Sequence, residues 1–354
     1  MGLKKLDIHQ FRNLETIQLH PSPRINYIFG ENGAGKTNLL ESIYYLSYGR
    51  SFRQGQTRDL IQHHQSVFRL VAETAGPREH HIGLERRQQE QIIRVDRQNV
   101  KTMAEVSALF PVLAIHPDSH QLLNGGPEYR RQFLDWGVFH VKHDFIQHWR
   151  QYRKALSQRN AALRQSQNAR LCQSWDTVLL EHAGVIEDSR KDYLETIRSM
   201  TNNLAEQFFP SMKIVLQYRP GVAEGRSLAE HLEKQLDQDL NAGYTQAGPH
   251  RADIRILVDD YPAYKVLSRG QQKKLITLLK LSQLRVFAET TQETCILLYD
   301  DLPAELDKSN RNLLLDQLHE LNVQTFITAI SPQQMDLDEA VSDASMFHVK
   351  HGRI

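Results

Sequence analysis

Eight consecutive residues match the phosphate-binding pattern G-x-x-x-x-G-K-[ST] at every fixed position; they are Gly30, Glu31, Asn32, Gly33, Ala34, Gly35, Lys36 and Thr37. In such a loop the glycines let backbone N–H groups turn toward phosphate oxygens. Lys36 would reach the outer phosphates as a catalytic residue, and the Thr37 hydroxyl would hold Mg²⁺. The pattern therefore predicts a nucleotide site. The alternative is a glycine-rich turn that binds nothing.

A second candidate group lies far along the chain, where the apolar run 295–299 ends in Asp300 and Asp301. Carboxylates at the end of a buried strand suit the metal shell of a phosphate site. We expect Asp300 to hold Mg²⁺ through water, and Asp301 to act as the catalytic base or to position the water. Two aspartates after a strand are common, so this signal gains its meaning from the loop at 30–37.

The segments around these residues predict the elements that position them. Residues 25–29 have the composition of a buried strand, and 38–48 carry apolar residues at helical spacing, which is the context that a phosphate loop needs. Toward the end of the chain, helices and strands alternate, which favours an α/β core with parallel strands. The segments expected there are 271–289 and 310–321 as helices and 295–299, 325–330 and 346–349 as strands.

Other parts of the chain have a different character. Short apolar clusters at 67–71, 81–84 and 92–95 predict an antiparallel β subdomain at about 51–110. From 129 to 209 the apolar residues recur at helical spacing. A strand at 213–218 and a helix at 228–240 follow, and 254–258 is again a strand. We therefore predict an α/β head made of 1–115 and 245–354, interrupted by a mostly helical lobe at 116–244.

Composition limits the possible functions. The 354 residues carry 43 Lys and Arg against 42 Asp and Glu, so the net charge of +1 makes no global case for nucleic-acid binding. Two cysteines form neither a disulfide framework nor a zinc site, and the His doublets at 63–64 and 80–81 are better explained as surface residues than as metal ligands. No apolar stretch approaches the about 20 residues of a membrane span, so we expect a soluble cytoplasmic protein with no membrane contact.

Positive charge is nevertheless concentrated locally. Residues 142–170 contain Asp144 as their only acid. This run predicts contact with nucleic acid, and the alternative is a solvated helix face. The candidate DNA-binding residues are Arg130, Arg131, Arg150, Arg153, Lys154 and Arg159.

A third motif carries a resemblance. Residues 267–273 read L-S-R-G-Q-Q-K and resemble the L-S-G-G-Q signature of the ABC ATPases. The resemblance implies ATP and Mg²⁺ as cofactors and an ABC-type head. It also implies a homodimer in which Ser268, Arg269, Gly270 and Gln271 bind the γ-phosphate of the ATP held by a second copy, with Asp307 in the D-loop. The alternative for Ser268 is an ordinary helix cap.

The chain departs from the ABC pattern at two positions. Asp301 stands where the superfamily usually has Glu, which predicts a less firmly held water and slow hydrolysis, as in a switch rather than a motor. The expected switch histidine after the strand at 325–330 is absent, and only Thr328 and Ser331 lie nearby.

Over its whole length the chain resembles the RecF family of recombination mediators, which is related to SMC and Rad50 heads. The matching segments are 11–13 (F-R-N), 30–37, 116–118 (H-P-D), 126–135 (G-P-E-Y-R-R-Q-F-L-D), 155–160 (A-L-S-Q-R-N), 248–253 (G-P-H-R-A-D), 267–273 and 300–307. The resemblance places Arg12 and Asn13 close to the nucleotide. Ala252, where relatives often carry Asp, leaves the role of the segment around 250 open.

This resemblance also implies a function. Such proteins bind ATP, dimerise on it, and bind double-stranded DNA and the edges of single-stranded gaps. With RecO and RecR they help RecA replace the single-strand-binding protein in repair and fork recovery, and a weak, DNA-stimulated ATPase resets them. Two alternatives remain, an ATPase subunit of a transporter and a scaffold whose nucleotide is purely structural.

Overall fold

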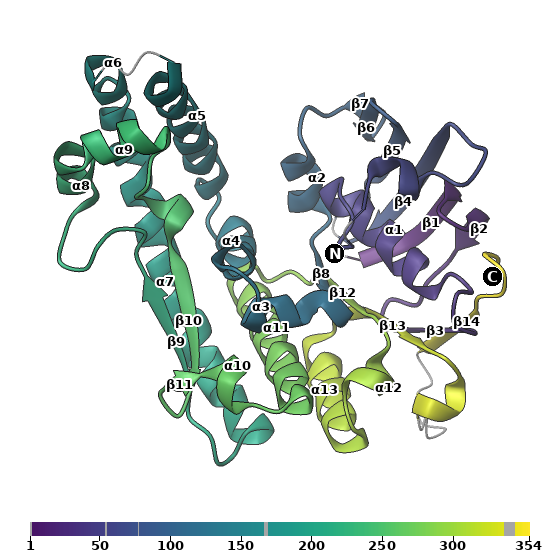
Figure 1. The fold of residues 1–354 in the computed structure, drawn as a ribbon. Helices are drawn as coiled ribbons and strands as arrows, with labels where there is room; N and C mark the ends of the chain where they lie inside the picture. Colours follow the sequence, from purple (N-terminus) through teal and green to yellow (C-terminus); the bar gives the residue numbers. More distant parts are fainter. Residues whose placement is uncertain (1, 54, 77, 166–168, 336–343) are drawn as a thin grey trace. The chain divides into compact units, whose positions relative to one another are not determined.

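The computed structural model describes residues 2–53, 55–76, 78–165, 169–335 and 344–354. The chain forms two compact units. The first consists of Met1–Ser119 and Lys273–Ile354, and the second of His120–Gln272. Figure 1 labels the elements of both units.

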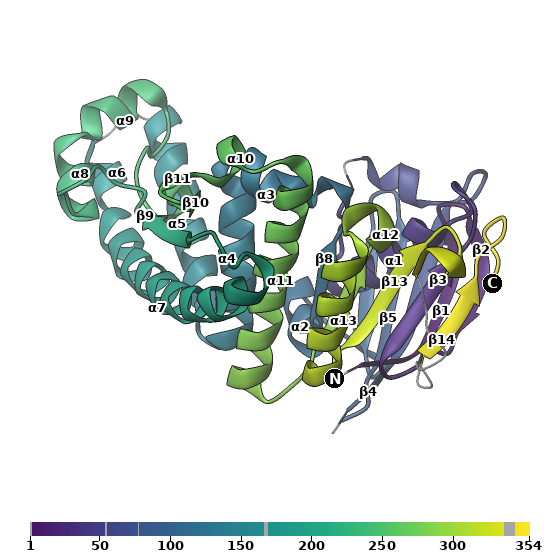
Figure 2. The same cartoon turned by 90° about the horizontal axis from the view of Figure 1, so that it is seen from below.

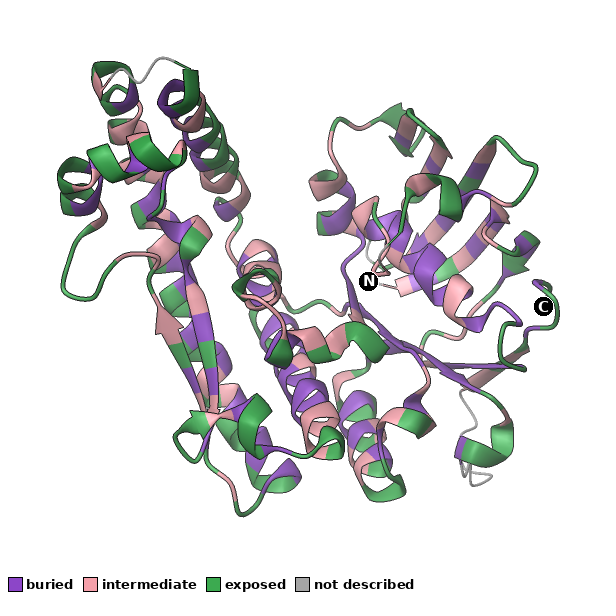
Figure 3. Cartoon of the chain, in the orientation of Figure 1, coloured by how far each residue is buried: buried purple, intermediate pink, exposed green. Residues whose placement is uncertain are grey.

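A parallel sheet forms the centre of the first unit. Its strand order is β14 (Ala344–His348), β3 (Ile25–Phe29), β13 (Gln324–Ala329), β12 (Ile296–Tyr299) and β8 (Val112–Ile115). Every neighbouring pair is parallel. All residues of β12 and β13 are buried, as Figure 3 shows, which explains why β12 is a continuous apolar run rather than an alternating one. Strand β13 also buries Gln324, Thr325 and Thr328, and their side chains are hydrogen-bonded.

An antiparallel sheet forms the other β layer of this unit. Its order is β2 (Leu14–Leu19), β1 (Gly2–Phe11), β4 (Val67–Ala75), β5 (His81–Arg87), β6 (Gln91–Val95) and β7 (Gln98–Asn99). The antiparallel subdomain predicted at about 51–110 is therefore present, and β1 and β2 join it. Strand β1 pairs with β4, and the buried Leu6 and Ile8 of β1 belong to the core beneath the sheet.

Helix α1 (Lys36–Tyr48) follows the phosphate-loop segment, and its apolar residues share one core with both sheets. On the opposite face of the parallel sheet lie α12 (Leu302–Glu305) and α13 (Lys308–Leu321), as Figures 1 and 2 show. The remaining short elements of this unit are η1 (Thr57–Leu60), α2 (Met103–Leu109) and η4 (Pro332–Met335), and η2 (Pro117–His120) crosses into the second unit.

The second unit contains the predicted helical lobe. Its longest helix, α7 (Asp176–Phe208), has 33 residues and packs against α5 (Phe145–Gln165), α4 (Pro127–Val141) and β9 (Ile214–Arg219). The other helices are α3 (Gln121–Asn124), α6 (Ala169–Gln173), α8 (Leu228–Lys234), α9 (Leu236–Ala242), η3 (Pro249–Arg251) and α10 (Ala263–Val266). Helix α11 (Arg269–Thr291) begins in this unit and continues into the first.

The observed organisation differs from the predicted one at three places. The lobe contains an antiparallel sheet of β11 (Tyr261–Pro262), β10 (Asp253–Val258) and β9, so β10 pairs within the lobe and not in the head. The second unit extends to Gln272, whereas we expected the head to resume at 245. The helix predicted at 228–240 is two helices, α8 and α9, because the backbone of Gln235 leaves the helical region with ψ of 20°.

Candidate functional site

The phosphate-loop motif lies between β3 and α1, as the sequence predicts. Gly35 has φ of 120°, and a side chain there would collide with Leu14 and Asn13. Gly30 has φ of 153°, and a β-carbon would overlap the carbonyl oxygen of Val349. Both positions require glycine because other segments of the same unit press directly against the loop.

Lys36 begins α1 and folds back over the loop. Its Nζ donates to the carbonyl oxygens of Gly30 at 2.7 Å and Glu31 at 3.0 Å. Burial lowers the pKa of Lys36, while the carboxylates of Asp301 and Asp300 raise it. The ammonium group therefore lies against the phosphate loop, close enough to Asp300 and Asp301 for their charges to stabilise it.

Asp300 directly follows β12 and lies against α1, although 263 positions separate it from Thr37. Its Oδ1 accepts hydrogen bonds from the Thr37 hydroxyl at 2.9 Å and the Thr328 hydroxyl at 2.7 Å. Among the residues that the structure describes, none donates to Oδ2. Burial raises the pKa of Asp300, against the two hydroxyl hydrogen bonds and the charge of Arg53, which lower it.

Asp301 follows in an uncommon backbone conformation, with φ of 56° and ψ of 49°. Its N–H donates to the Thr328 hydroxyl at 2.7 Å. One hydroxyl thus orients the Asp300 carboxylate and fixes the backbone of Asp301. A non-glycine residue at positive φ is held only where its surroundings determine it, and such residues gather at functional sites.

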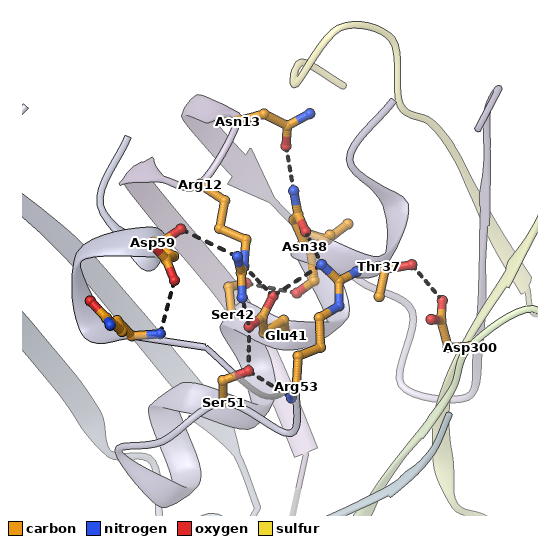
Figure 4. Close-up of polar contacts among 12 residues, drawn as sticks. Arg12, Asn13, Thr37, Asn38, Glu41, Ser42, Ser51, Arg53, Asp59 and Asp300 are labelled. Atoms are coloured by element: carbon orange, nitrogen blue, oxygen red, sulfur yellow. Dashed lines mark hydrogen bonds and ion pairs between the residues drawn. The ribbon is translucent and has the colours of Figure 1, made fainter. Parts of the chain in front are cut away.

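A buried carboxylate lies one turn into α1. Glu41 is fully buried and accepts two hydrogen bonds from the Arg12 guanidinium, at 2.5 and 2.6 Å. It also accepts from the Ser51 hydroxyl, and Arg53 lies 3.6 Å away. Figure 4 shows these side chains converging on Glu41. Glu41 therefore ties the β1–β2 turn and the segment at 51–53 to the helix that carries Thr37.

Asn13 and Asn38 connect this cluster to the phosphate loop. Asn38 donates to the Asn13 carboxamide oxygen at 2.7 Å and accepts from Arg53 at 2.9 Å. The Asn13 amide donates to the carbonyl oxygens of Gly33 and Ala34, at 3.2 and 3.3 Å. Arg12 and Asn13 thus lie beside the loop, as the resemblance implies, with Arg12 committed to Glu41.

The signature residues begin α11 and lie in the second unit. Ser268 is an N-cap residue, since its hydroxyl accepts from the Gln271 N–H and its own N–H donates to the Gln271 side chain. Ser268, Arg269 and Gly270 are exposed, and a β-carbon at Gly270 would meet no atom within 4 Å. The chain's own packing therefore does not explain the glycine.

Asp307 caps α13 and accepts from the Asn310 N–H at 3.0 Å and from the Asn310 side chain at 2.6 Å. The backbone hydrogen bond from Asn310 lowers the pKa of Asp307. Its place in the D-loop remains a prediction.

The candidate DNA-binding residues divide into three sets by their exposure. Arg159 is fully buried and paired with Asp176 and Asp239, so it cannot reach a DNA phosphate, and we withdraw it from that set. Arg130 and Arg131 are half-buried and bonded to Asp253 and to the Ala252 carbonyl oxygen. The exposed members are Arg150, Arg153 and Lys154.

The described residues contain no group of three His, Cys, Asp or Glu side chains that could hold a metal ion by themselves. In the same part of the chain, no helix has the length and apolar character to cross a membrane.

Comparison with known proteins identifies the class of protein to which this fold belongs. A family model described as the RecF/RecN/SMC N-terminal domain matches residues 2–353. An Smc head domain with an extended coiled coil from Pyrococcus furiosus shares the fold, with a TM-score of 0.59 at 14% identity over 99% of this chain and 94% of that one. The fold is that of an ABC-type ATPase head.

Closer relatives specify the family. The DNA replication and repair protein RecF of Thioalkalivibrio sulfidiphilus is 39% identical over 357 residues, which cover 100% of this chain and 99% of the relative. RecF of Shewanella baltica is 38% identical with the same coverage. A structure of the recombination mediator protein RecF with ATP has a TM-score of 0.89 at 30% identity, covering 99% of this chain and 97% of that one. The chain belongs to the RecF family.

Sequence reasoning missed the roles of Glu41 and Arg53 and left Thr328 without one. A charged residue amid the apolar positions of 39–46 was the available signal for Glu41. Thr328 had no motif of its own, because its importance arises from the pairing of β13 with β12.

The first prediction concerns Asp300. Since its pKa is raised on folding, the folded protein binds this proton more tightly, and stability falls as pH rises through that pKa. Asp300→Asn removes the buried charge, so we expect the nucleotide-free variant to be more stable than wild type by about 1 kcal/mol at pH 7. The advantage should shrink at low pH. Thermal unfolding across pH measures it.

The exposed Asp316→Asn on α13 is the control and should leave stability nearly unchanged. An Asp300→Asn variant that is less stable than wild type at neutral pH would contradict this account of the charge.

The second prediction concerns Glu41. Glu41→Gln leaves the largely buried Arg12 without its counter-charge, so we expect the free energy of unfolding to fall by about 3 kcal/mol. The double variant Arg12→Gln/Glu41→Gln should recover part of this loss. Urea unfolding of both variants measures the coupling. Glu85→Gln, which weakens the solvent-accessible pairs of the half-buried Glu85 with the exposed Arg69 and Arg87, should cost at most about 1 kcal/mol. Equal losses for Glu41→Gln and Glu85→Gln would refute the role of Glu41.

Proposed function

We propose that the chain is an ATP-dependent recombination mediator that binds DNA in repair and in recovery of replication forks. The observation that carries this proposal is the buried Asp300 carboxylate, which is held by hydroxyls from the phosphate-loop helix and a neighbouring strand and forms no ion pair with a Lys, Arg or His side chain of the described residues. Such an arrangement suits a site completed by a ligand. The ATP-bound RecF relative supports ATP as that ligand.

The donor set fits Mg²⁺. Thr37 offers a hydroxyl and Asp300 a carboxylate with Oδ2 free of protein donors among the described residues, and hard oxygen ligands of this kind suit Mg²⁺. When bound, the ion would neutralise charge on the phosphates. Lys36, now bonded to loop carbonyl oxygens, would turn to the outer phosphates.

Asp301 is the residue that we propose as the base or water-positioning group. Its backbone N–H is bonded to Thr328, so the point from which its side chain leaves the backbone is set before substrate arrives. The side chain is one methylene shorter than the Glu usual in ABC ATPases, which supports slow turnover. We propose a weak, DNA-stimulated ATPase in which hydrolysis ends the bound state rather than driving movement.

The signature residues support a homodimer closed by ATP, since Ser268, Arg269 and Gly270 are exposed and Gln271 is half-buried. A helix N-terminus offers free N–H groups and a positive dipole end to an anion, and at Gly270 nothing in the chain itself obstructs approach. We propose that they contact the γ-phosphate of ATP held by a second copy, with Asp307 nearby. Binding of ATP then favours the closed dimer, and hydrolysis removes the γ-phosphate contact that holds the dimer closed.

We further propose that the ATP-bound dimer acts in the cytoplasm on double-stranded DNA and gap junctions, and helps load RecA together with RecO and RecR. The relatives' description as DNA replication and repair proteins, and as mediators in the RecFOR pathway, supports these partners.

The third prediction tests the dimer. We expect ATP with Mg²⁺ to double the molar mass measured by light scattering, and ADP to leave it unchanged, because the γ-phosphate joins the two copies. Ser268→Arg should bind ATP and stay monomeric. Lys36→Arg changes the phosphate loop itself, so its comparison with Ser268→Arg distinguishes loss of nucleotide binding from loss of the contact between the two copies. A mass that never responds to nucleotide would overturn the clamp and favour a structural nucleotide.

A further inference from the structure

A segment of the second unit is fixed by side chains from three helices, and nothing so far accounts for it. The segment is 244–253, between α9 and β10. Arg190 of α7, fully buried, donates to the Pro249 carbonyl oxygen at 2.7 Å. Arg131 of α4 donates to the Ala252 carbonyl oxygen at 2.8 Å. The side chains of Arg190 and Arg131 thus hold the backbone of this segment in one conformation.

The two ends of the segment are fixed in the same way. Arg130 forms two hydrogen bonds with the Asp253 carboxylate, at 2.7 and 3.1 Å. At the other end, Arg159 donates to the Thr245 hydroxyl at 2.8 Å, and the Asn160 carboxamide oxygen accepts from the Thr245 N–H at 2.8 Å.

The middle of the segment is held through a histidine. Because the Thr245 carbonyl oxygen can only accept, His250 donates to it from Nε2, at 3.0 Å. Nδ1 of His250 therefore accepts the hydroxyl hydrogen of the buried Tyr152, at 2.6 Å. Gly248 has φ of 126°, and a β-carbon there would collide with the Tyr152 hydroxyl. The close contact between Gly248 and Tyr152, together with the two hydrogen bonds of His250, restricts the backbone of this segment to one conformation.

What this rigid segment carries outward is Arg251. Its side chain is exposed and lies over the ring of Tyr244, with the guanidinium carbon 5.1 Å from the ring centroid. On the adjoining helix α5, the exposed Arg153 also acts on His250. Among the described residues, neither Arg153 nor Arg251 forms an ion pair with an acid.

The pKa of His250 shows that this surface carries positive charge. Burial, together with the charges of Arg251, Arg131 and Arg153, lowers its pKa to about 4, against the hydrogen bond with the Thr245 carbonyl oxygen, which raises it. His250 therefore stays neutral at physiological pH, and the net field of its charged neighbours is positive.

We propose that Arg251, supported by Tyr244, and Arg153 form a contact surface for the phosphate backbone of double-stranded DNA. The surface rests on the DNA binding proposed above and gives it a location. A planar guanidinium stacked on an aromatic ring keeps its N–H groups free in one plane, which suits bidentate binding of a phosphate. Phosphate contacts of this kind are independent of base sequence.

The fixed backbone explains why the segment is so strongly held. An exposed arginine on a mobile loop would lose conformational freedom when it bound, whereas Arg251 is already positioned. The internal arginines, Arg130, Arg131, Arg159 and Arg190, thus position the segment that carries the outward one. The basic character of the lobe serves the fold and the proposed surface at once.

The fourth prediction tests the surface by fluorescence anisotropy with a labelled DNA duplex, using the full chain with ATP and Mg²⁺ over a range of salt. We expect Arg251→Gln to weaken binding roughly three- to tenfold and to reduce the slope of log affinity against log salt by about one. Arg153→Gln should behave in the same way. Arg226→Gln, an exposed arginine elsewhere in the same unit, is the matched control and should change neither quantity.

A second variant tests the positioning. Tyr152→Phe keeps every charge but frees His250, so affinity should fall while the salt slope stays as in wild type. Circular dichroism confirms that each variant is folded. If wild type binds duplex and Arg251→Gln binds equally well with an equal slope, the surface is refuted and DNA binding stands. If wild type does not bind, the proposed function fails as well. If Arg251→Gln loses the ATP-dependent mass increase but keeps DNA affinity, the surface belongs to a second copy, and this inference is overturned.

Discussion

Two threonine hydroxyls that meet on one carboxylate oxygen define the site at which we propose that nucleotide binds. Thr37 brings the first turn of α1 to Asp300, and Thr328 brings the neighbouring strand to the same atom. Thr328 also receives the N–H of Asp301, so its hydroxyl fixes the conformation of both aspartates. The parallel pairing of β12 with β13 makes this contact possible, because it sets the two strand ends side by side.

Glu41 and Asp300 are both buried carboxylates of the first unit, but their negative charges are stabilised in different ways. Glu41 is neutralised by a bidentate hydrogen-bonded pair with Arg12 and stabilises the frame around the loop. Among the described residues, Asp300 receives side-chain hydrogen bonds only from hydroxyls, and its raised pKa reflects the energetic cost of burying the charge. The charge of Glu41 is thus balanced within the chain, whereas we propose that a bound cation balances that of Asp300. In the second unit, Arg159 and Arg190 resemble Glu41, since their charges are paired with internal carboxylates.

The sequence predicted the strands of the parallel sheet and α1 closely, because buried strands and amphipathic helices carry local signals. It predicted that the glycine-rich loop lies between a strand and a helix and that the two aspartates follow a buried strand, because the loop motif has fixed spacing and the strand is an apolar run. The roles of these residues remain predictions. It could not place β10, whose pairing with β9 is a long-range choice with no local signature. Nor could it separate Arg159 from Arg153, since helical spacing shows which residues share a face but not which face is covered. Thr328 and Glu41 acquire their roles only when distant segments meet. The position of the signature relative to a second copy remains a prediction.

The most direct test of this account is the affinity for ATP as a function of Mg²⁺ concentration, measured by calorimetry for Thr328→Val and Thr328→Ser. Serine keeps the hydroxyl and should bind like wild type, whereas valine should raise the Mg²⁺ concentration needed for half-maximal binding by about tenfold. Thr325→Val is the control, because Thr325 is buried on the same strand and bonds to the Val323 carbonyl oxygen, away from the site. If Thr328→Val binds Mg²⁺ and ATP like wild type, or if Thr325→Val loses as much, the hydroxyl of Thr328 does not organise the site and the account is wrong.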